Sequence, residues 1–268
     1  MRKILAAIGI LYLLFFISGC STEKAVANMD NQAYGDKKIV WQKLEEDIYG
    51  SGKREKIVFY VYETAEGMPL IWSLEVNGEE VIKLNHDDGF FSQSQIKFDD
   101  IDGDNKPEAL LYRYSTGSAG AQCLNIYKIS PENWFLIFSE DKLNDYTESD
   151  NGRFNVEYLG DYQVSFSDNQ TGLKVNIPLE KELYKGIENM LEGISTWVDP
   201  VSEFEAKDID GNKKKEIITR QRVIGVAHVD TIALFETIYK LTEGQYKPIR
   251  AMLLDIKGNI LGEIEISK

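Results

Sequence analysis

Acidic side chains alternate along residues 100–108, which read Asp-Ile-Asp-Gly-Asp-Asn-Lys-Pro-Glu. Carboxylates stand at positions 1, 3, 5 and 9 of this segment, which are Asp100, Asp102, Asp104 and Glu108. Neighbouring carboxylates repel one another unless a cation lies between them. Oxygen donors in this number suit Ca²⁺, which takes about six to eight oxygen ligands. The segment therefore predicts a calcium loop, with the backbone carbonyl of Lys106 at position 7 as a further ligand.

The same spacing recurs along the chain. Residues 208–216 again have an acid first, a glycine three positions later and a glutamate eight positions later, and the predicted ligands are Asp208, Asp210, Asn212, the carbonyl of Lys214 and Glu216. Weaker copies begin at Asp47 and Asp255, where Tyr49 and Lys257 replace the second acid. We expect one or two structural calcium ions in the two acid-rich copies. In the weaker copies we expect only a glycine turn.

The four loops resemble the Asp-x-Asp-Gly-Asp-Gly-x-x-Asp loop of the FG-GAP and VCBS repeat families, which are β-propeller-like modules of extracellular proteins. The resemblance extends from about residue 40 to 266. The family's second glycine is replaced by Asn105 and Lys213, and its last aspartate by Glu108 and Glu216. The loops do not have helix-loop-helix spacing, because that loop has its glycine at position 6 and its closing glutamate at position 12. The resemblance implies calcium-stabilised β repeats.

The N-terminus has the features of an export signal. Arg2 and Lys3 precede an apolar run over residues 4–17, which is shorter than the ~20 residues that a membrane span needs. The following Ile-Ser-Gly-Cys resembles the bacterial lipobox, which implies removal of residues 1–19 and a lipid on Cys20. We therefore expect a lipid anchor on the extracytoplasmic face of the cell membrane. An ordinary signal peptide with an incidental Cys20 is the alternative.

Composition excludes some functions. The chain carries a net charge of −14, and loss of the two positive charges of residues 1–19 leaves −16. So acidic a protein is a poor ligand for nucleic acid, and membrane attachment must come from the anchor rather than from a basic patch. Once Cys20 is lipidated, Cys123 is the one remaining cysteine, so no internal disulfide forms. We expect Cys123 to be a small buried hydrophobic residue.

β-Branched and aromatic runs separated by turn residues predict strands over most of the chain. After a flexible tether over residues 20–38, the predicted β-repeat domain covers 39–268. Its loops begin at residues 47, 100, 208 and 255, so the unit is about 50 residues long and one middle unit lacks its loop. The predicted fold is all-β, a propeller-like or incomplete propeller of roughly four antiparallel blades. The predicted strands are 56–62, 70–76, 80–84, 109–114, 124–129, 134–138, 154–159, 162–167, 172–177, 217–223, 231–239 and 246–254.

One segment has helical periodicity. Between residues 180 and 195, apolar side chains recur at helical spacing, namely Leu183, Tyr184, Ile187, Met190, Leu191 and Ile194. We expect a single helix that packs this stripe against the sheets. A partner-binding helix is the alternative.

Residues suited to catalysis are few. His86 lies in an acidic turn with Asp87 and Asp88. His228 and Asp230 alternate on a strand after Arg222, so these three side chains are a candidate ligand cleft: Arg222, His228 and Asp230. The chain contains no nucleophile elbow, phosphate-binding glycine loop, HExxH or CxxC motif.

These patterns favour a lipid-anchored extracytoplasmic protein that binds an unknown protein or glycan, or that scaffolds the envelope. Structural calcium is expected and nucleic acid is not. An enzyme is disfavoured, although a hydrolase of an envelope polymer with a cleft near His228 and Asp230 is the principal alternative. A subunit of a larger surface machine is a further one. Because repeat folds host many activities, the fold alone does not decide between these functions.

Overall fold

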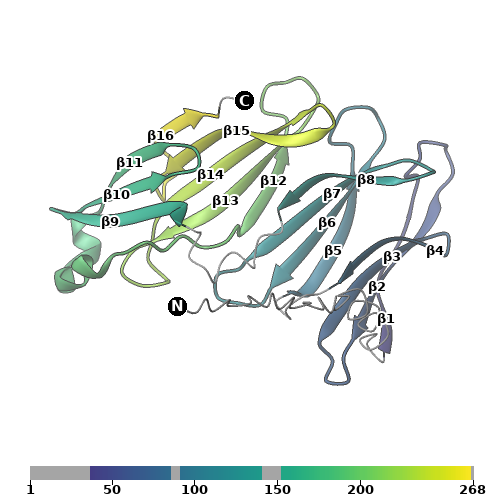
Figure 1. Ribbon diagram of the computed structural model, residues 1–268, viewed down its shortest axis with the longest axis horizontal. Helices are drawn as coiled ribbons and strands as arrows, with labels where there is room; N and C mark the ends of the chain where they lie inside the picture. The colour runs from purple at the N-terminus through teal and green to yellow at the C-terminus, as the bar shows by residue number, and fades with distance from the viewer. Residues whose placement is uncertain (1–36, 86–90, 141–151, 267–268) are drawn as a thin grey trace, which may run out of the picture. The chain divides into compact units, whose positions relative to one another are not determined.

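The computed structural model describes residues 37–85, 91–140 and 152–266, all within the compact unit Gly35–Lys268. These residues form sixteen strands in four antiparallel sheets, and neighbours in each sheet are also neighbours in sequence (Figure 1). The first sheet contains β1 (Lys37–Glu46), β2 (Glu55–Glu63), β3 (Pro69–Val76) and β4 (Glu79–Asn85). The second contains β5 (Phe91–Asp99), β6 (Glu108–Ser115), β7 (Gln122–Ile129) and β8 (Trp134–Glu140).

The remaining strands form two further sheets. The third sheet contains β9 (Phe154–Gly160), β10 (Gln163–Asp168) and β11 (Leu173–Pro178). The fourth contains β12 (Glu203–Lys207), β13 (Glu216–Ile224), β14 (Thr231–Thr242), β15 (Gln245–Leu254) and β16 (Ile260–Glu265). The all-β prediction is confirmed. Within the described ranges, the four sheets close into neither a barrel nor a propeller, so the number of blades stays a prediction.

The repeat unit differs in phase from the predicted one. Counting each unit from the start of its acidic loop does not match the sheets, because a strand of the same sheet precedes the loop in the first, second and fourth sheets. The predicted tether is also slightly too long, because β1 begins at Lys37. The Asp255 loop does not start another sheet. It joins β15 to β16 within the fourth sheet.

Alternating burial explains how the sheets pack on one another. Along β6, Ala109 and Leu111 join the core shared with the first sheet, whereas Leu110 joins the core shared with the fourth. The first part of the strand is therefore buried on both faces, which explains the apolar run Ala-Leu-Leu at its start. A third core lies between the third and fourth sheets, where the rings of Phe154 and Phe235 meet edge to face at 5.3 Å.

The segment predicted as one helix is helical but interrupted. It forms two short 3-10 helices, η2 (Lys181–Tyr184) and η3 (Glu188–Gly193). Gly186 lies between them with φ +86°, a left-handed conformation that an α-helix cannot contain. The apolar stripe is accordingly split: Tyr184, Leu191 and Ile194 are buried, whereas Leu183, Ile187 and Met190 are exposed. In the described part of the chain, no helix has the length and apolar character to cross a bilayer.

Candidate functional site

Three of the four acidic loops occupy the same place in their sheets. The loops at Asp47, Asp100 and Asp208 connect β1 to β2, β5 to β6, and β12 to β13. In the first two, the isoleucine after the aspartate is fully buried between successive sheets, as Ile48 and Ile101. In these two loops the Asp-Ile start places an apolar side chain under the loop, whereas Ile209 of the Asp208 loop is 43% exposed.

The first and ninth acids of each loop organise the backbone. Asp100 accepts hydrogen bonds from the backbone N–H groups of Gly103 (2.8 Å) and Asn105 (2.9 Å). Glu108 accepts one from the N–H of Ile101 at 3.0 Å and is almost fully buried. The Asp208 loop repeats this pattern, because Asp208 accepts from Gly211 and Lys213 while Glu216 accepts from Ile209. These acids therefore have a turn-forming role that requires no metal.

The carboxylates nevertheless converge as a cation site would require. Asp100, Asp102 and Glu108 each offer an oxygen within 4.8 Å of the others, and Asp208, Asp210 and Glu216 do the same. Asp104 and Asn212, at position 5, instead accept the backbone N–H groups of Lys106 (2.9 Å) and Lys214 (2.7 Å). Calcium at either loop stays a prediction. The carboxylates that would bind it already contact a lysine ammonium group.

A lysine ammonium group lies on each acid-rich loop. Lys128 of β7 contacts the carboxylates of Asp102 and Asp104, the latter at 3.0 Å, and its Nζ is 3.7 Å from Glu108. Lys240 of β14 lies 2.5 Å from Asp210 and 3.6 Å from Glu216. Sequence reasoning missed both lysines, since nothing in the loop sequence identifies a partner on a distant strand.

The electrostatics of the Asp100 loop follow from this contact. Burial opposes the charge of Lys128, but hydrogen bonds to Asp102 and Asp104 outweigh it, so the pKa of Lys128 is raised. Burial raises the pKa of Glu108 to about 7, against the lowering effect of its backbone hydrogen bonds. In the Asp208 loop, the hydrogen bond to Asp210 raises the pKa of Lys240. The loops are thus acidic clusters with a cation already supplied by the chain.

The acidic loops also contact one another. A methyl group added at Gly50 would meet the side chain of Lys106 at 3.4 Å, and one added at Gly103 would lie 2.8 Å from the carbonyl oxygen of Lys213. Lys215 completes the second contact, because its N–H donates to the carbonyl of Ile101 at 2.8 Å and its ammonium binds Asp99 at 2.7 Å. The glycine at the fourth position of the loop therefore allows close approach as well as a turn.

Of the three residues of the candidate ligand cleft, Arg222 and His228 lie together and Asp230 does not join them. Arg222 and His228 meet, with Nη2 and Nε2 3.1 Å apart, and both contact the fully buried carboxylate of Asp199. The ring of Trp197 stacks on His228 at 5.2 Å. Sequence reasoning missed Asp199, which belongs to none of the sixteen strands and stands in no recognisable motif.

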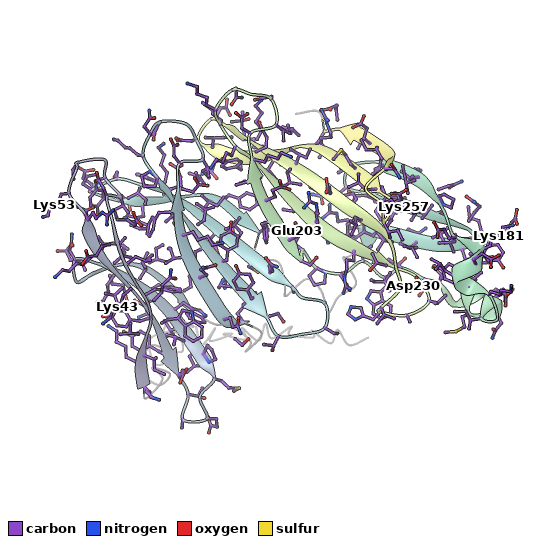
Figure 2. The ribbon with its side chains drawn as sticks, turned by 180° about the vertical axis from the view of Figure 1, so that it is seen from behind. Lys43, Lys53, Lys181, Glu203, Asp230 and Lys257 are labelled. Atoms are coloured by element: carbon purple, nitrogen blue, oxygen red, sulfur yellow. The ribbon has the colours of Figure 1, made fainter. Side chains whose placement is uncertain are left out.

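Asp230 has different partners. Its carboxylate accepts hydrogen bonds from the Tyr184 hydroxyl (3.1 Å) and from the N–H of Val226 (2.9 Å). Gly225 permits this arrangement, because a methyl group there would come within 2.2 Å of the Asp230 carboxylate. Asp230 and Lys257, both labelled in Figure 2, line a pocket of about 260 Å³ beside η2. Asp230 thus holds the β13–β14 turn against η2.

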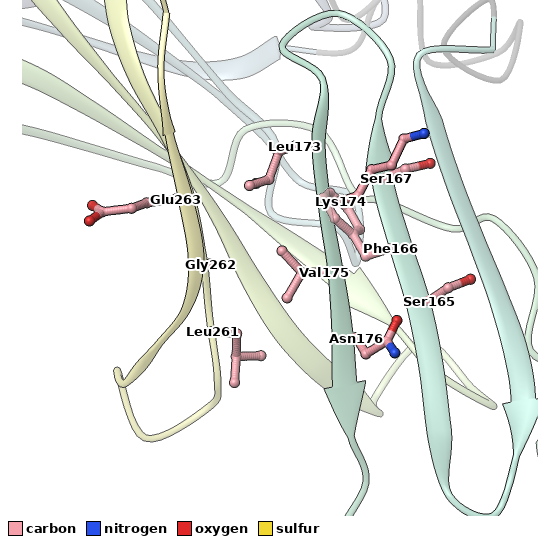
Figure 3. Close-up of a pocket in the computed structure, with 10 residues that line it drawn as sticks. All are labelled: Ser165, Phe166, Ser167, Leu173, Lys174, Val175, Asn176, Leu261, Gly262 and Glu263. Carbon is pink, nitrogen blue, oxygen red and sulfur yellow. The ribbon is translucent and has the colours of Figure 1, made fainter.

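A larger hollow of about 680 Å³ lies along β10, β11 and β16. Figure 3 shows Val175 and Leu261 between strands β11 and β16, while the carboxylate of Glu263 points away from β11. A methyl group at Gly262 would lie 2.6 Å from Val175, so the two strands approach closely. We interpret this hollow as a packing seam between two sheet edges.

Several predicted residues are structural or lie elsewhere. Cys123 is buried, as expected for a small hydrophobic side chain. The Asp47 loop has Tyr49 and Ser51 at the positions of the second and third acids, and Asp47 accepts the N–H groups of Ser51 and Gly52. Cys20 and the stretch containing His86, Asp87 and Asp88 lie outside the described residues.

Comparison with known families bears on the C-terminal half of the described chain. Residues 152–254 match the model of the YybI C-terminal domain family. This segment runs from β9 through β15 and so includes the Asp208 loop and the Asp199 cluster. No curated protein and no solved structure matches the chain. The similarity therefore concerns the third sheet and most of the fourth.

Proposed function

We propose that this chain is a lipid-anchored extracytoplasmic protein that binds an envelope component or scaffolds the envelope. One observation carries the proposal: the side chains best suited to chemistry are engaged in contacts that hold the fold together. Arg222 and His228 close on Asp199, and Asp230 holds a turn. An enzyme needs a base, an acid and an orienting group around an open site. Neither described pocket has that convergence.

Exposed apolar side chains support a role in contact with another macromolecule. Val229, at the tip of the β13–β14 turn, is 93% exposed, and Leu183 of η2 is 61% exposed. Trp197, which stacks on His228, is also exposed. Exposure of large apolar groups to water costs free energy, and this cost is removed when a partner covers them.

The proposal depends on the anchor at Cys20 and does not depend on calcium. Cys20→Ala should release the protein from the membrane fraction into the medium or the soluble fraction, whereas Cys123→Ala should not. Metabolic labelling with a fatty acid measures the lipid directly. Membrane retention of Cys20→Ala without label would contradict the anchor.

Binding and hydrolysis of an envelope polymer are separated by one assay. The purified protein is incubated with washed cell-wall polymer, and both the protein that sediments with the polymer and the soluble fragments released are measured. We expect sedimentation without release of fragments, and Val229→Asp to reduce sedimentation while Lys247→Met, which removes an exposed ion pair with Glu243, leaves it unchanged. Release of fragments that is lost in His228→Ala would instead establish the hydrolase alternative.

A further inference from the structure

The two acid-rich loops each contact a lysine from the third strand of their own sheet. The two lysines occupy equivalent positions in the strand register of their sheets. In the second sheet, Ala109 pairs with Tyr127, so Lys128 stands opposite Glu108. In the fourth sheet, Ile217 pairs with Tyr239, so Lys240 stands opposite Glu216. The lysine is therefore opposite the closing glutamate in both sheets.

The first sheet provides an internal comparison. There Ile57 pairs with Val76, and Lys56 exchanges hydrogen bonds with Asn77, which places Gly78 opposite the closing residue Glu55. This loop has Tyr49 and Ser51 where the others have acids or an amide. The lysine is thus present where the loop carries additional acids and absent where only the first and ninth residues are acids.

A lysine ammonium group and a calcium ion cannot occupy the same acidic loop together. A lysine ammonium group is a compact charge with three N–H donors, and around Lys128 those donors face the carboxylates of Asp102, Asp104 and Glu108. Calcium needs about six to eight oxygens and would require the same carboxylates. An ion entering the loop must therefore displace the ammonium group, since two cations at one position repel each other.

We propose that Lys128 and Lys240 are built-in counter-ions of the two acidic loops, so that the folded protein holds these corners without calcium. The proposal goes beyond the proposed function and is independent of it, because a binding protein or a scaffold can use either cation. It replaces the calcium expectation with a role for two residues of the chain.

Thermal unfolding of the full-length protein, purified in mild detergent, tests the proposal in millimolar calcium and in excess chelator. We expect the wild-type midpoint to be the same in both. Lys128→Met and Lys240→Met should each lower the midpoint in chelator by roughly 3 °C or more, because they leave clustered carboxylates without a cation. Lys247→Met is the matched control, since it removes an exposed ion pair with Glu243 on the same fourth sheet and should change the midpoint by roughly 1 °C or less.

Calcium should partly restore the two loop variants, because removal of the lysine opens the carboxylates to an external cation. If Lys128→Met does not fold, Lys240→Met at the more exposed loop and calorimetric titration of the wild type with calcium still decide the question. A wild-type midpoint that rises in calcium, with the rise lost in Asp100→Ala, would overturn the proposal. Equal midpoints for Lys240→Met and Lys247→Met in chelator would overturn it as well.

Discussion

Replacement of one loop glycine by alanine should distinguish turn geometry from loop packing. Gly103 and Gly211 hold the same position in their loops, and both have φ +76°. A methyl group at Gly103 would lie 2.8 Å from the carbonyl oxygen of Lys213, whereas one at Gly211 would have nothing within 4 Å. The two alanine variants therefore carry the same backbone strain and differ in contact with the neighbouring loop.

The expected losses follow from those two terms. Placing an L-residue in the left-handed region costs about 1–2 kcal/mol, and both variants lose this amount of unfolding free energy. Gly103→Ala must in addition push against a backbone oxygen, and overpacking of this kind costs roughly 1–3 kcal/mol. We therefore expect the free energy of unfolding to fall by about 1–2 kcal/mol in Gly211→Ala and by about 2–5 kcal/mol in Gly103→Ala.

Urea unfolding monitored by circular dichroism measures both losses. The dependence of the unfolding free energy on urea should be unchanged, because neither variant alters the surface exposed on unfolding. Equal losses in the two variants would show that the Asp100 and Asp208 loops do not pack together, and the account of the loop glycines would be wrong.

Three further predictions follow from other positions. Lys213→Gly should stabilise the protein by up to about 1 kcal/mol in urea unfolding, because Lys213 has φ +71°, a left-handed conformation that glycine adopts without steric strain; a loss of stability would contradict that conformation. Asp199→Ala should destabilise by about 2–4 kcal/mol, since it leaves Arg222 and His228 without their shared carboxylate, and a loss no larger than that of an exposed ion pair would refute this role. Burial raises the pKa of Tyr112 to about 12 from an ordinary value of 10, so its contribution to stability is complete below pH 10 and is lost as the pH rises to about 12. The phenolate absorbance of Tyr112, taken as the difference between the wild type and Tyr112→Phe, should accordingly appear together with unfolding, and its appearance before unfolding would contradict the burial of this side chain.

Local sequence patterns were sufficient to predict most strands, because alternation of apolar residues reports directly on which face of a strand is buried. They also predicted a glycine turn at Asp47 and at Asp255, and both segments connect neighbouring strands. The Asp255 loop shows the limit of this reasoning. It begins with the same Asp-Ile and glycine, yet it is the hairpin turn between β15 and β16, where the N–H of Asp255 donates to the carbonyl of Asn259. A loop motif does not reveal which connection of a sheet it forms.

The parts of the site that escaped prediction depend on pairing between distant strands. Lys128 reaches the Asp100 loop only because β6 and β7 pair in the observed register, and Lys240 reaches the Asp208 loop for the same reason in β13 and β14. The prediction of one continuous helix was wrong for a local reason. Gly186 adopts φ +86° and ends the first helical turn, although the apolar residues keep helical spacing across it. Asp230 alternates with His228 in sequence but lies at the end of a turn, so strand periodicity does not apply to it.

A high-resolution structure of crystals grown in millimolar calcium shows most directly which cation fills the acidic loops. We predict the Nζ atoms of Lys128 and Lys240 beside Asp102 and Asp210, with no anomalous density for calcium among the carboxylates. Calcium ions bound in these loops, with both lysine side chains turned into solvent, would contradict the account.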